Sequence, residues 1–460
     1  MEQTYDAVVI GGGPGGYTCA AQLAKYGRKT ALVERGLLGG TCLNRGCIPT
    51  KTFLHTVSVM EEMEKCRAWG LSCGAASLDQ AALLARKEEV TGQLRQGVAQ
   101  LLDSAGVTRL EGTARVTAPG RVEVELNEGG ALSLSAGDVV AAVGSKPALP
   151  PIPGCELPGV VTSDRILETF PVLNRLTVIG GGVVGVELAS LYAALGTQVT
   201  ILEGCPRILP GLDREIGQSL SMQLKKRGVQ IAVGAVVEKI ERDAEGLRCT
   251  YREKNTEYSA CSDAILVAVG RAPLAQALFS PSVPVVFDRG RVEVDGHMQS
   301  CVPHLYVVGD AAAGYPQLAH AASEQGLAAA AHIAGRPWST DLHLVPSCVY
   351  TEPEIASVGL SEAEAKAAGR GVRVGKAVTS ANGKSLLTGQ ERGFVKLVAG
   401  EDQVLLGAQL MCARATDMVG ELALAIARGV TVGELAALIR PHPTFEEVIG
   451  EAARACLSKF

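Results

Sequence analysis

The sequence predicts an α/β fold with two Rossmann-like strand–helix–strand units, followed by a C-terminal α+β segment. The main observation is an internal repeat: residues 6–34 read DAVVIGGGPGGYTCAAQLAKYGRKTALVE, and residues 176–203 read LTVIGGGVVGVELASLYAALGTQVTILE. Each copy has a short apolar run, a Gly-rich turn, an Ala-rich stretch and a second apolar run that ends in Glu. The apolar runs suit buried parallel strands, and the stretch between them suits a crossover helix.

The two Gly-rich turns share one spacing. A glutamate follows 23 residues after the first glycine in both: Gly11, Gly13, Gly16 and Glu34, then Gly180, Gly182, Gly185 and Glu203. This pattern between a strand and a helix is typical of dinucleotide binding, in which the glycines allow the turn, the approach of the pyrophosphate and helix packing. Two units predict two dinucleotides, most simply a flavin and a nicotinamide. A turn without a ligand stays open as the alternative for each copy.

Charge, the length of apolar runs and the position of prolines limit the possible partners, location and domain boundaries. The net charge is −5, which gives no reason to expect nucleic acid or an anionic membrane as partner. No apolar run is long enough for a membrane span, and the N-terminus lacks the pattern of a signal peptide, so we expect a cytoplasmic protein. The Pro-rich stretch KPALPPIPG breaks the chain after the first unit. We therefore expect four segments, at residues 1–147, 148–268, 269–340 and 341–460.

Two of the 13 cysteines stand apart, Cys42 and Cys47 in GGTCLNRGCIPTK. On a regular helix, residues five apart are too distant for a disulfide, at about 8–9 Å between Cα atoms. A bond between them therefore requires Cys42 to precede the helix, or a distorted first turn, and Gly46 and Pro49 suit such an entry. A helix N-terminus would favour the Cys47 thiolate. Two unpaired core cysteines remain the alternative, and we expect most of the other cysteines to be unpaired and buried.

GGTCLNRGCIPTK resembles the redox motif of the flavoprotein disulfide reductases, the class I pyridine nucleotide–disulfide oxidoreductases, and within them most of all that of dihydrolipoyl dehydrogenases. The resemblance covers nearly the whole chain, through AVGS at 142–145, GVELAS at 185–190, AVGRAP at 268–273, VVGD at 307–310, LAHAASEQG at 318–326 and HPTFEE at 442–447. It implies that residues 1–147 and 269–340 bind FAD, that residues 148–268 bind NAD, and that residues 341–460 form a dimerisation domain.

The resemblance also implies roles for individual residues. Cys42 becomes the interchange thiol and Cys47 the charge-transfer thiol of a redox disulfide. Lys51 lies beside the flavin with Glu187 as its ion-pair partner, and Asp310 binds the ribityl chain. The other implied cofactor positions are Gly40, Thr41, Ala114, Val143, Gly144, Ser145, Val236, Gly270, Gln317, Leu318, Ala319 and His320. A surface position for Lys51 or Glu187 and a structural role for His320 stay open. Val143 and Arg440 depart from the family pattern, which often has Thr and His there.

The implied reaction is the oxidation of a dihydrolipoyl protein by NAD through the Cys42–Cys47 disulfide and FAD. It needs a base, and His442, between Pro441 and Pro443, is the candidate, with Glu447 orienting it. Thr444 to Glu447 also reads as a capping box, in which Glu447 would instead bond to the Thr444 N–H. In relatives the base reaches the disulfide of the other subunit, so the implied unit is a homodimer.

Glu203 predicts that the protein uses NAD rather than NADP, because a carboxylate there binds the ribose hydroxyls and repels a 2′-phosphate. A solvated strand end is its alternative. We expect lipoyl domains or a lipoyl carrier protein of a 2-oxoacid dehydrogenase or glycine cleavage complex as partner, with no nucleic acid, membrane or metal. A glutathione- or mercuric-reductase-like enzyme and a non-catalytic flavoprotein subunit stay open as other functions.

Overall fold

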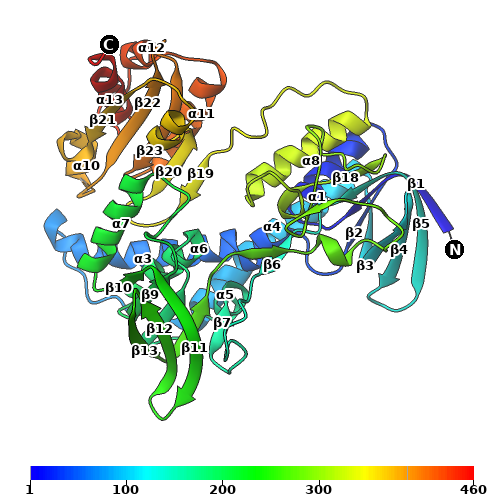
Figure 1. The fold of residues 1–460 in the computed structure, drawn as a ribbon, viewed down its shortest axis with the longest axis horizontal. Coiled ribbons are helices and arrows are strands. Elements are labelled where there is room, and N and C mark those ends of the chain that lie inside the picture. Colours follow the sequence, from blue (N-terminus) through cyan, green and yellow to red (C-terminus); the bar gives the residue numbers. More distant parts are fainter. Residues whose placement is uncertain (1, 391) are drawn as a thin grey trace. The chain divides into compact units, whose positions relative to one another are not determined.

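The computed structural model describes residues 2–390 and 392–460 (Figure 1). The chain forms two compact units. The first takes in the residues up to Ala148 together with Thr162–Val172 and Gly270–His343. The second takes in Leu149–Val161, Leu173–Val269 and Leu344–Phe460. Each unit is therefore assembled from segments that are far apart in the sequence.

A mainly parallel sheet forms the centre of the first unit. Its parallel strands lie in the order β3 (Thr108–Ala118), β2 (Thr30–Glu34), β1 (Glu2–Ile10), β5 (Ala131–Ala141), β18 (Leu305–Val307). Strand β4 (Arg121–Leu126) pairs antiparallel with both β3 and β5. Two small antiparallel pairs complete the strands: β6 (Ser145–Pro147) with β15 (Arg271–Pro273), and β16 (Phe287–Asp288) with β17 (Arg291–Val292).

The helices of the first unit are α1 (Pro14–Lys25), α2 (Gly40–Arg45), α3 (Cys47–Lys65), α4 (Gln80–Ala105), α5 (Ser163–Thr169) and α8 (Ala319–Ile333), with 3₁₀ turns η1 (Cys66–Trp69), η2 (Ala275–Ala277) and η3 (Gly309–Ala311). Helices α1 and α8 pack so closely that a Cβ on Gly326 would lie 2.4 Å from the carbonyl oxygen of Gly15. Strand β1 lies between β2 and β5, and its residues Ala7 to Ile10 are all buried. The apolar run of the first repeat is thus a core strand, as predicted.

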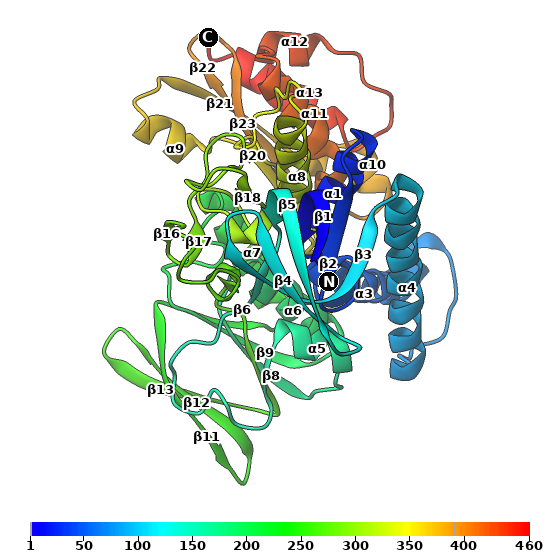
Figure 2. The ribbon, with the colours of Figure 1, turned by 90° about the vertical axis from the view of Figure 1, so that its right-hand side faces the viewer.

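The second unit contains the second copy of the repeat. Strands β8 (Arg175–Ile179) and β9 (Gln198–Glu203) flank α6 (Val183–Ala194) in a sheet ordered β10 (Gln230–Val233), β9, β8, β14 (Ala264–Val267), β7 (Val160–Thr162). Helix α7 (Arg214–Lys226) connects β9 to β10. An antiparallel sheet of β11 (Ala235–Asp243), β12 (Gly246–Glu253) and β13 (Thr256–Ser262) follows, drawn in green (Figures 1 and 2).

The C-terminal part of the second unit is an α+β layer structure. Its antiparallel sheet is ordered β19 (Ser347–Val349), β20 (Ile355–Gly359), β23 (Leu405–Met411), β22 (Phe394–Gly400), β21 (Val372–Val378). Its helices are α9 (Glu362–Ala367), α10 (Gly383–Leu387), α11 (Ala415–Ala427), α12 (Val432–Ala437) and α13 (Glu447–Leu457), with the 3₁₀ turn η4 (Thr379–Ala381). A Cβ on Gly375 would lie 2.1 Å from the carbonyl oxygen of Ala452, so α13 lies directly on β21.

A buried lysine connects this C-terminal sheet to helix α7, which belongs to the same compact unit. The Lys396 ammonium on β22 lies 3.1 Å from Oδ2 of Asp213 and 3.2 Å from Oε2 of Glu362. Asp213 is the N-cap of α7, and its Oδ1 accepts the N–H of Glu215. Two carboxylates offset the cost of burying one ammonium, which is the arrangement that makes a buried charge tolerable.

The structure agrees with the predicted α/β class. The expectation that most of the other eleven cysteines are buried was wrong, because only Cys19, Cys66, Cys249, Cys412 and Cys456 are buried. Cys66 and Cys73 form a disulfide, although no feature of the sequence had set them apart. The division at residues 147, 268 and 340 stays a prediction. Within the described part of the chain, no helix combines the length and the apolar character needed to cross a membrane.

Candidate redox site and dinucleotide turns

The first Gly-rich turn is a tight junction between β1 and α1. Gly11 has φ +106°, and a Cβ there would lie 2.3 Å from the carbonyl oxygen of Ala142. A Cβ on Gly16 would lie only 1.8 Å from the carbonyl oxygen of Gly11. Both positions therefore require glycine for packing within the protein.

The second turn repeats these contacts in the other unit. Gly180 has φ +107°, and its Cβ would lie 2.4 Å from the carbonyl oxygen of Ala268. A Cβ on Gly185 would lie 2.0 Å from the carbonyl oxygen of Gly180. The two turns therefore share their backbone geometry as well as their amino-acid sequence pattern.

The middle glycine of each turn differs from its neighbours. A Cβ on Gly13 would meet nothing nearer than the Cα of Gly40, at 3.9 Å, and one on Gly182 would meet no protein atom within 4 Å. Their φ angles of −75° and −74° suit any residue. The protein itself does not require glycine here, so the open space at the helix N-terminus fits a phosphate group.

Glu34 and Glu203 brace the two turns in the same way. Oε2 of Glu34 accepts the N–H of Gly12 at 2.6 Å, and Oε1 accepts the N–H of Gly36 at 2.7 Å. Oε2 of Glu203 accepts the N–H of Gly181 at 2.5 Å, and Oε1 accepts that of Cys205 at 2.6 Å. Each carboxylate oxygen keeps a second lone pair that can accept a ribose hydroxyl.

Cys42 and Cys47 lie on either side of a helix break. Cys42 is in α2, Gly46 has φ −146° and ψ −109°, and Cys47 is the first residue of α3. The break is the distortion that the five-residue spacing requires if the two sulfur atoms are to meet. The two side chains hydrogen-bond to each other, and their disulfide stays a prediction.

The electrostatics of the pair are unequal. The pKa of the Cys42 thiol lies far above its ordinary value, first because it hydrogen-bonds to Cys47, and then because of burial and the negative charge of Cys47. The Lys51 ammonium, one helical turn beyond Cys47, acts in the opposite direction. The pKa of the Tyr17 phenol is also raised, by burial and then by Cys42. Loss of the Cys42 proton is therefore disfavoured beside Cys47.

Asn44 and Arg95 hold the segment that carries Cys42. The Asn44 amide donates to the carbonyl oxygens of Leu38 at 3.0 Å and Gly40 at 2.8 Å. Arg95 from α4 donates to Oδ1 of Asn44 at 3.1 Å. These bonds fix the short helix α2, which is too short to be stable by itself.

Asp310 lies in a small polar cluster with Ser145 and Arg271. The Ser145 hydroxyl donates to Oδ2 of Asp310 and accepts Nε–H of Arg271 at 2.7 Å. Arg271 also donates to Oγ1 of Thr41 at 3.4 Å, and its Nε lies 3.8 Å from Asp310. The cluster brings together three predicted flavin positions. Arg271, which joins them, lies in AVGRAP and was not among the predicted site residues.

Gln325 supports the end of β18. Its Oε1 accepts the N–H of Gly309 at 2.7 Å, directly before Asp310. Among the described residues, the buried Nε2 atoms of Gln325 and Gln317 have no hydrogen-bond partner. Such orphaned donors are uncommon. Gln317 is a predicted cofactor position and Gln325 lies beside Asp310, so both donors fit a ligand that supplies the missing acceptor.

The other predicted cofactor residues are placed as follows. Gly40 has φ +56° and Gly144 φ +66°. Glu187 is buried in α6, where Oε1 accepts the N–H of Tyr350 at 2.9 Å. Val143 follows β5, Ala114 is in β3, Leu318 precedes α8, Ala319 and His320 begin it, Val236 is exposed on β11, and Gly270 is open with φ +125°. The pairing of Lys51 with Glu187 stays a prediction.

Glu447 makes both of the contacts that were considered for it. Oε1 lies 2.9 Å from Nδ1 of His442, and Oε2 accepts the Thr444 N–H at 2.9 Å. The capping box is only half formed, because the Thr444 hydroxyl donates to the carbonyl oxygen of Pro441. The pKa of Glu447 is lowered, first by Thr444 and then by His442. The ionised carboxylate thus orients an imidazole whose side chain is 77% exposed.

Arg440, which departs from the family pattern, is a buried anchor of the same loop. Its side chain is only 5% exposed and forms an ion pair with Glu421, and its Nη1 donates to the carbonyl oxygen of Leu435 at 3.1 Å. Burial raises the pKa of Glu421, and Arg440 partly offsets this. The loop with His442 is thereby fixed to α11 and α12.

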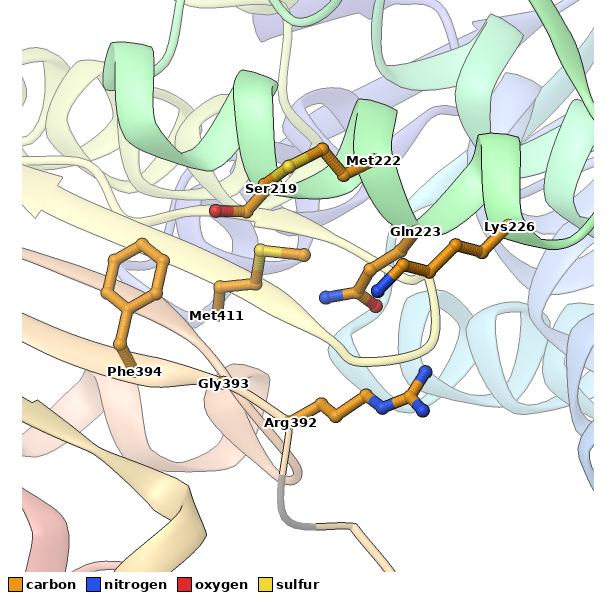
Figure 3. A pocket seen from close by; sticks show the side chains of 8 residues that line it. All are labelled: Ser219, Met222, Gln223, Lys226, Arg392, Gly393, Phe394 and Met411. Atoms are coloured by element: carbon orange, nitrogen blue, oxygen red, sulfur yellow. The ribbon is translucent and has the colours of Figure 1, made fainter.

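A cavity of about 270 Å³ lies in the second unit between α7 and strands β22 and β23. Figure 3 shows the side chains of Lys226 and Arg392 at its edge, with Met222, Met411 and Phe394. Its lining contains no thiol, imidazole or carboxylate, so it lacks the groups that thiol–disulfide chemistry needs.

Two family models match the chain. The pyridine nucleotide-disulphide oxidoreductase model covers residues 5–326, and the dimerisation domain of the same family covers residues 345–453. The chain belongs to this family. Members of the family use FAD and NAD(H), and Cys42 and Cys47 lie within the part of the chain that the first model matches.

Proteins of known name and structure are similar to this chain over nearly its full length. A dihydrolipoyl dehydrogenase of Bacillus subtilis (strain 168) is 36% identical over 473 residues, covering 100% of this chain and 99% of the relative. One of Geobacillus stearothermophilus is 37% identical over 460 residues, covering 98% and 96%. The HOCl-induced flavoprotein disulfide reductase RclA of Escherichia coli, solved as a Cu(II) complex, has a TM-score of 0.86 and 28% identity, covering 98% of this chain and 99% of that chain.

The protein is therefore a disulfide oxidoreductase of this family that uses FAD and NAD(H). The residues present fit both cofactors: each turn has an open middle glycine and a braced glutamate, and the first unit adds the Asp310 cluster. Glu34 and the turn at Gly13 would hold the FAD nucleotide, and Glu203 and the turn at Gly182 would hold NAD.

We expect Gly182→Ala to raise KM for NAD at least about tenfold, or ~1.4 kcal/mol, because its methyl group enters the space for the pyrophosphate. FAD content and Tm should not change, because the new Cβ meets no protein atom within 4 Å. Gly13→Ala should instead fold but purify with little FAD. Steady-state kinetics, flavin absorbance and thermal unfolding measure these effects.

The matched control is Gly185→Ala, whose Cβ would lie 2.0 Å from the carbonyl oxygen of Gly180 and should lower Tm. An unchanged KM for NAD in Gly182→Ala would mean that no phosphate approaches this turn.

Proposed function

We propose that the protein is a dihydrolipoyl dehydrogenase, which oxidises protein-bound dihydrolipoyl groups and reduces NAD to NADH. The observation that carries the proposal is the pair of unequal thiols across the break at Gly46. Similarity to dihydrolipoyl dehydrogenases over the whole chain supports the choice of substrate.

The proposed reaction begins with Cys42 and Cys47 joined as a disulfide. A dihydrolipoyl thiolate attacks Sγ of Cys42, a mixed disulfide forms, and Cys47 leaves as a thiolate. The second substrate thiolate then attacks the substrate sulfur of the mixed disulfide and breaks its bond to Cys42. The oxidised lipoyl group leaves, and the Cys42 thiolate takes up one of the protons released by the substrate thiols. Two electrons have moved from the substrate to the cysteine pair. When bound, FAD supplies the two-electron chemistry that links this dithiol to NAD.

The two thiols suit these separate roles. A good leaving thiol has a low pKa, and a thiolate at the first residue of α3 faces the positive end of the helix dipole, with Lys51 one turn away. The raised pKa of Cys42 keeps the proton on the thiol that exchanges with substrate. The product is then a Cys42 thiol beside a Cys47 thiolate.

His442 is the proposed base. Glu447 holds Nδ1, which leaves Nε2 of an exposed imidazole to take the proton from a substrate thiol. We place this base at the disulfide of the other subunit of a homodimer. In support, the chain carries the dimerisation domain, and Leu438 and Ile439, directly before the His442 loop, are 53% and 94% exposed. Apolar side chains this exposed are typical of a surface that another chain covers.

The remaining expectations are also proposals. The substrate would be the lipoyl domain or lipoyl carrier protein of a 2-oxoacid dehydrogenase or glycine cleavage complex, in the cytoplasm. Segments 1–147 and 269–340 would form the FAD-binding domain, segment 148–268 the NAD-binding domain and segment 341–460 the dimerisation domain.

With dihydrolipoamide as substrate, we expect kcat/KM for NAD to exceed that for NADP at least about tenfold, which requires only ~1.4 kcal/mol of differential binding. The reason is Glu203, whose oxygens already accept two N–H groups and would repel a 2′-phosphate. Steady-state assays with both nucleotides, and with glutathione disulfide and NADPH as the comparison, measure this. No turnover of dihydrolipoamide, or equal use of NADP, would contradict the proposal.

His442→Gln should slow dihydrolipoamide oxidation more than about a hundredfold, the scale of a lost general base, with unchanged FAD content. His304→Gln, at an exposed histidine paired with Asp138, is the matched control and should keep full activity. Heterodimers of His442→Gln with Cys47→Ser should regain part of the activity, because one of their two sites has both groups. Heterodimers that form without any recovery would show that the base does not act across the dimer.

A further inference from the structure

A second cysteine pair lies at the opposite end of the helix that begins with Cys47. Helix α3 ends at Lys65, Cys66 opens the 3₁₀ turn η1, and Cys66 forms a disulfide with Cys73. At a rise of 1.5 Å per residue, Cys66 is about 28 Å along the helix from Cys47. This pair is therefore remote from the redox site and has no part in the chemistry described above.

We propose that, once reduced, Cys66 and Cys73 bind one soft monovalent cation, Cu(I), together with the thioether of Met63. Soft thiolate and thioether ligands select Cu(I) over hard cations, which prefer oxygen. This inference does not rest on the dihydrolipoyl substrate, because it uses none of the residues assigned to that reaction.

The sulfur atoms are brought together by helix geometry. Met60, Met63 and Cys66 are three residues apart, so they follow one face of α3 into η1, where residues i and i+3 lie over one another. Cys73 returns to the same place, with Sγ 3.2 Å from the carbonyl oxygen of Met63. The Met63 side chain has three rotatable bonds and can turn its sulfur toward the pair.

Met60 and Met63 of this face also line a cavity of about 450 Å³, which neither cysteine lines. Its lining is His55, Thr56, Val59, Met60, Met63 and residues 75–78, and it contains no carboxylate. Met63 is 38% exposed, and Cys73 is exposed, so an ion can enter from solvent. The wall contains thioethers, an imidazole, the hydroxyls of Thr56 and Ser77 and apolar groups, and without carboxylates it disfavours Mg²⁺ and Ca²⁺.

The donor set also argues against zinc. Structural zinc sites use four Cys, His or carboxylate ligands in a tetrahedron. The described residues contain no group of three or more His, Cys, Asp or Glu that could hold a metal. Two thiolates and one thioether instead make a three-coordinate sulfur site, which suits Cu(I).

Reduction must come first, and it balances with a small dithiol such as dithiothreitol. One thiolate of the reagent attacks the Cys66–Cys73 bond, a mixed disulfide forms and one cysteine leaves. The second reagent thiolate then closes the oxidised ring and frees the other cysteine. Two electrons pass from the reagent to the pair, and both cysteines lose their protons when the cation binds.

The test uses the FAD-loaded Cys42→Ser/Cys47→Ser protein, in which the redox site cannot bind the ion. After reduction with dithiothreitol and anaerobic desalting, it is titrated with Cu(I) against the chromophoric chelator bicinchoninate. We expect one tightly bound Cu(I) per chain, and none without prior reduction. Adding Cys73→Ser should abolish that binding, and adding Met63→Leu, which keeps size and helix propensity, should weaken it about tenfold or more.

The matched control is Cys301→Ser, at another exposed cysteine, which should leave the bound Cu(I) unchanged. Equal Cu(I) binding with and without Cys73, or no binding by the reduced protein, would overturn the proposal. Binding that depends on Cys73 but is unaffected by Met63→Leu would refute the thioether ligand. None of these results depends on turnover of dihydrolipoamide, so failure here is distinct from failure of the proposed function.

Discussion

The close contact between the first and third glycine of each dinucleotide turn is the constraint on which the redox machinery depends. The carbonyl oxygen of Gly11 occupies the position that a side chain of Gly16 would take, and Gly180 and Gly185 repeat this. Only this contact lets the helix start directly above the end of the strand. The helix N-terminus then faces open space at Gly13 and Gly182, and the strand-end glutamates can bond to the turn.

Local geometry of the same kind makes the two proposed redox thiols unequal. A continuous helix would hold Cys42 and Cys47 apart, whereas the break at Gly46 brings them together and makes Cys47 the start of a new helix. The positive helix end and Lys51 favour charge on Cys47, while Cys42 is half-buried and its pKa is raised by its hydrogen bond with Cys47. A short backbone irregularity thus sets both the spacing and the polarity of the pair.

Much of this could be predicted from sequence because it depends on residues close together in the chain. The turns, the glutamates and the helix break at Gly46 are of this kind, and so are both roles of Glu447, which proved compatible because a carboxylate has two oxygens. Arg271 was missed because its partner Ser145 is 126 residues away. Cys66 and Cys73 were missed because only the return of the chain from η1 brings them together.

Anaerobic titration with dithionite tests the central claim most directly, that Cys42 and Cys47 exchange electrons with the flavin. The FAD-loaded wild-type protein should take up about four electrons per chain, two for the flavin and two for the disulfide, and Cys47→Ser should take up about two. The remote Cys66–Cys73 pair should not contribute, so Cys73→Ser should still take up four. Uptake of only two electrons by the wild-type protein would contradict the account.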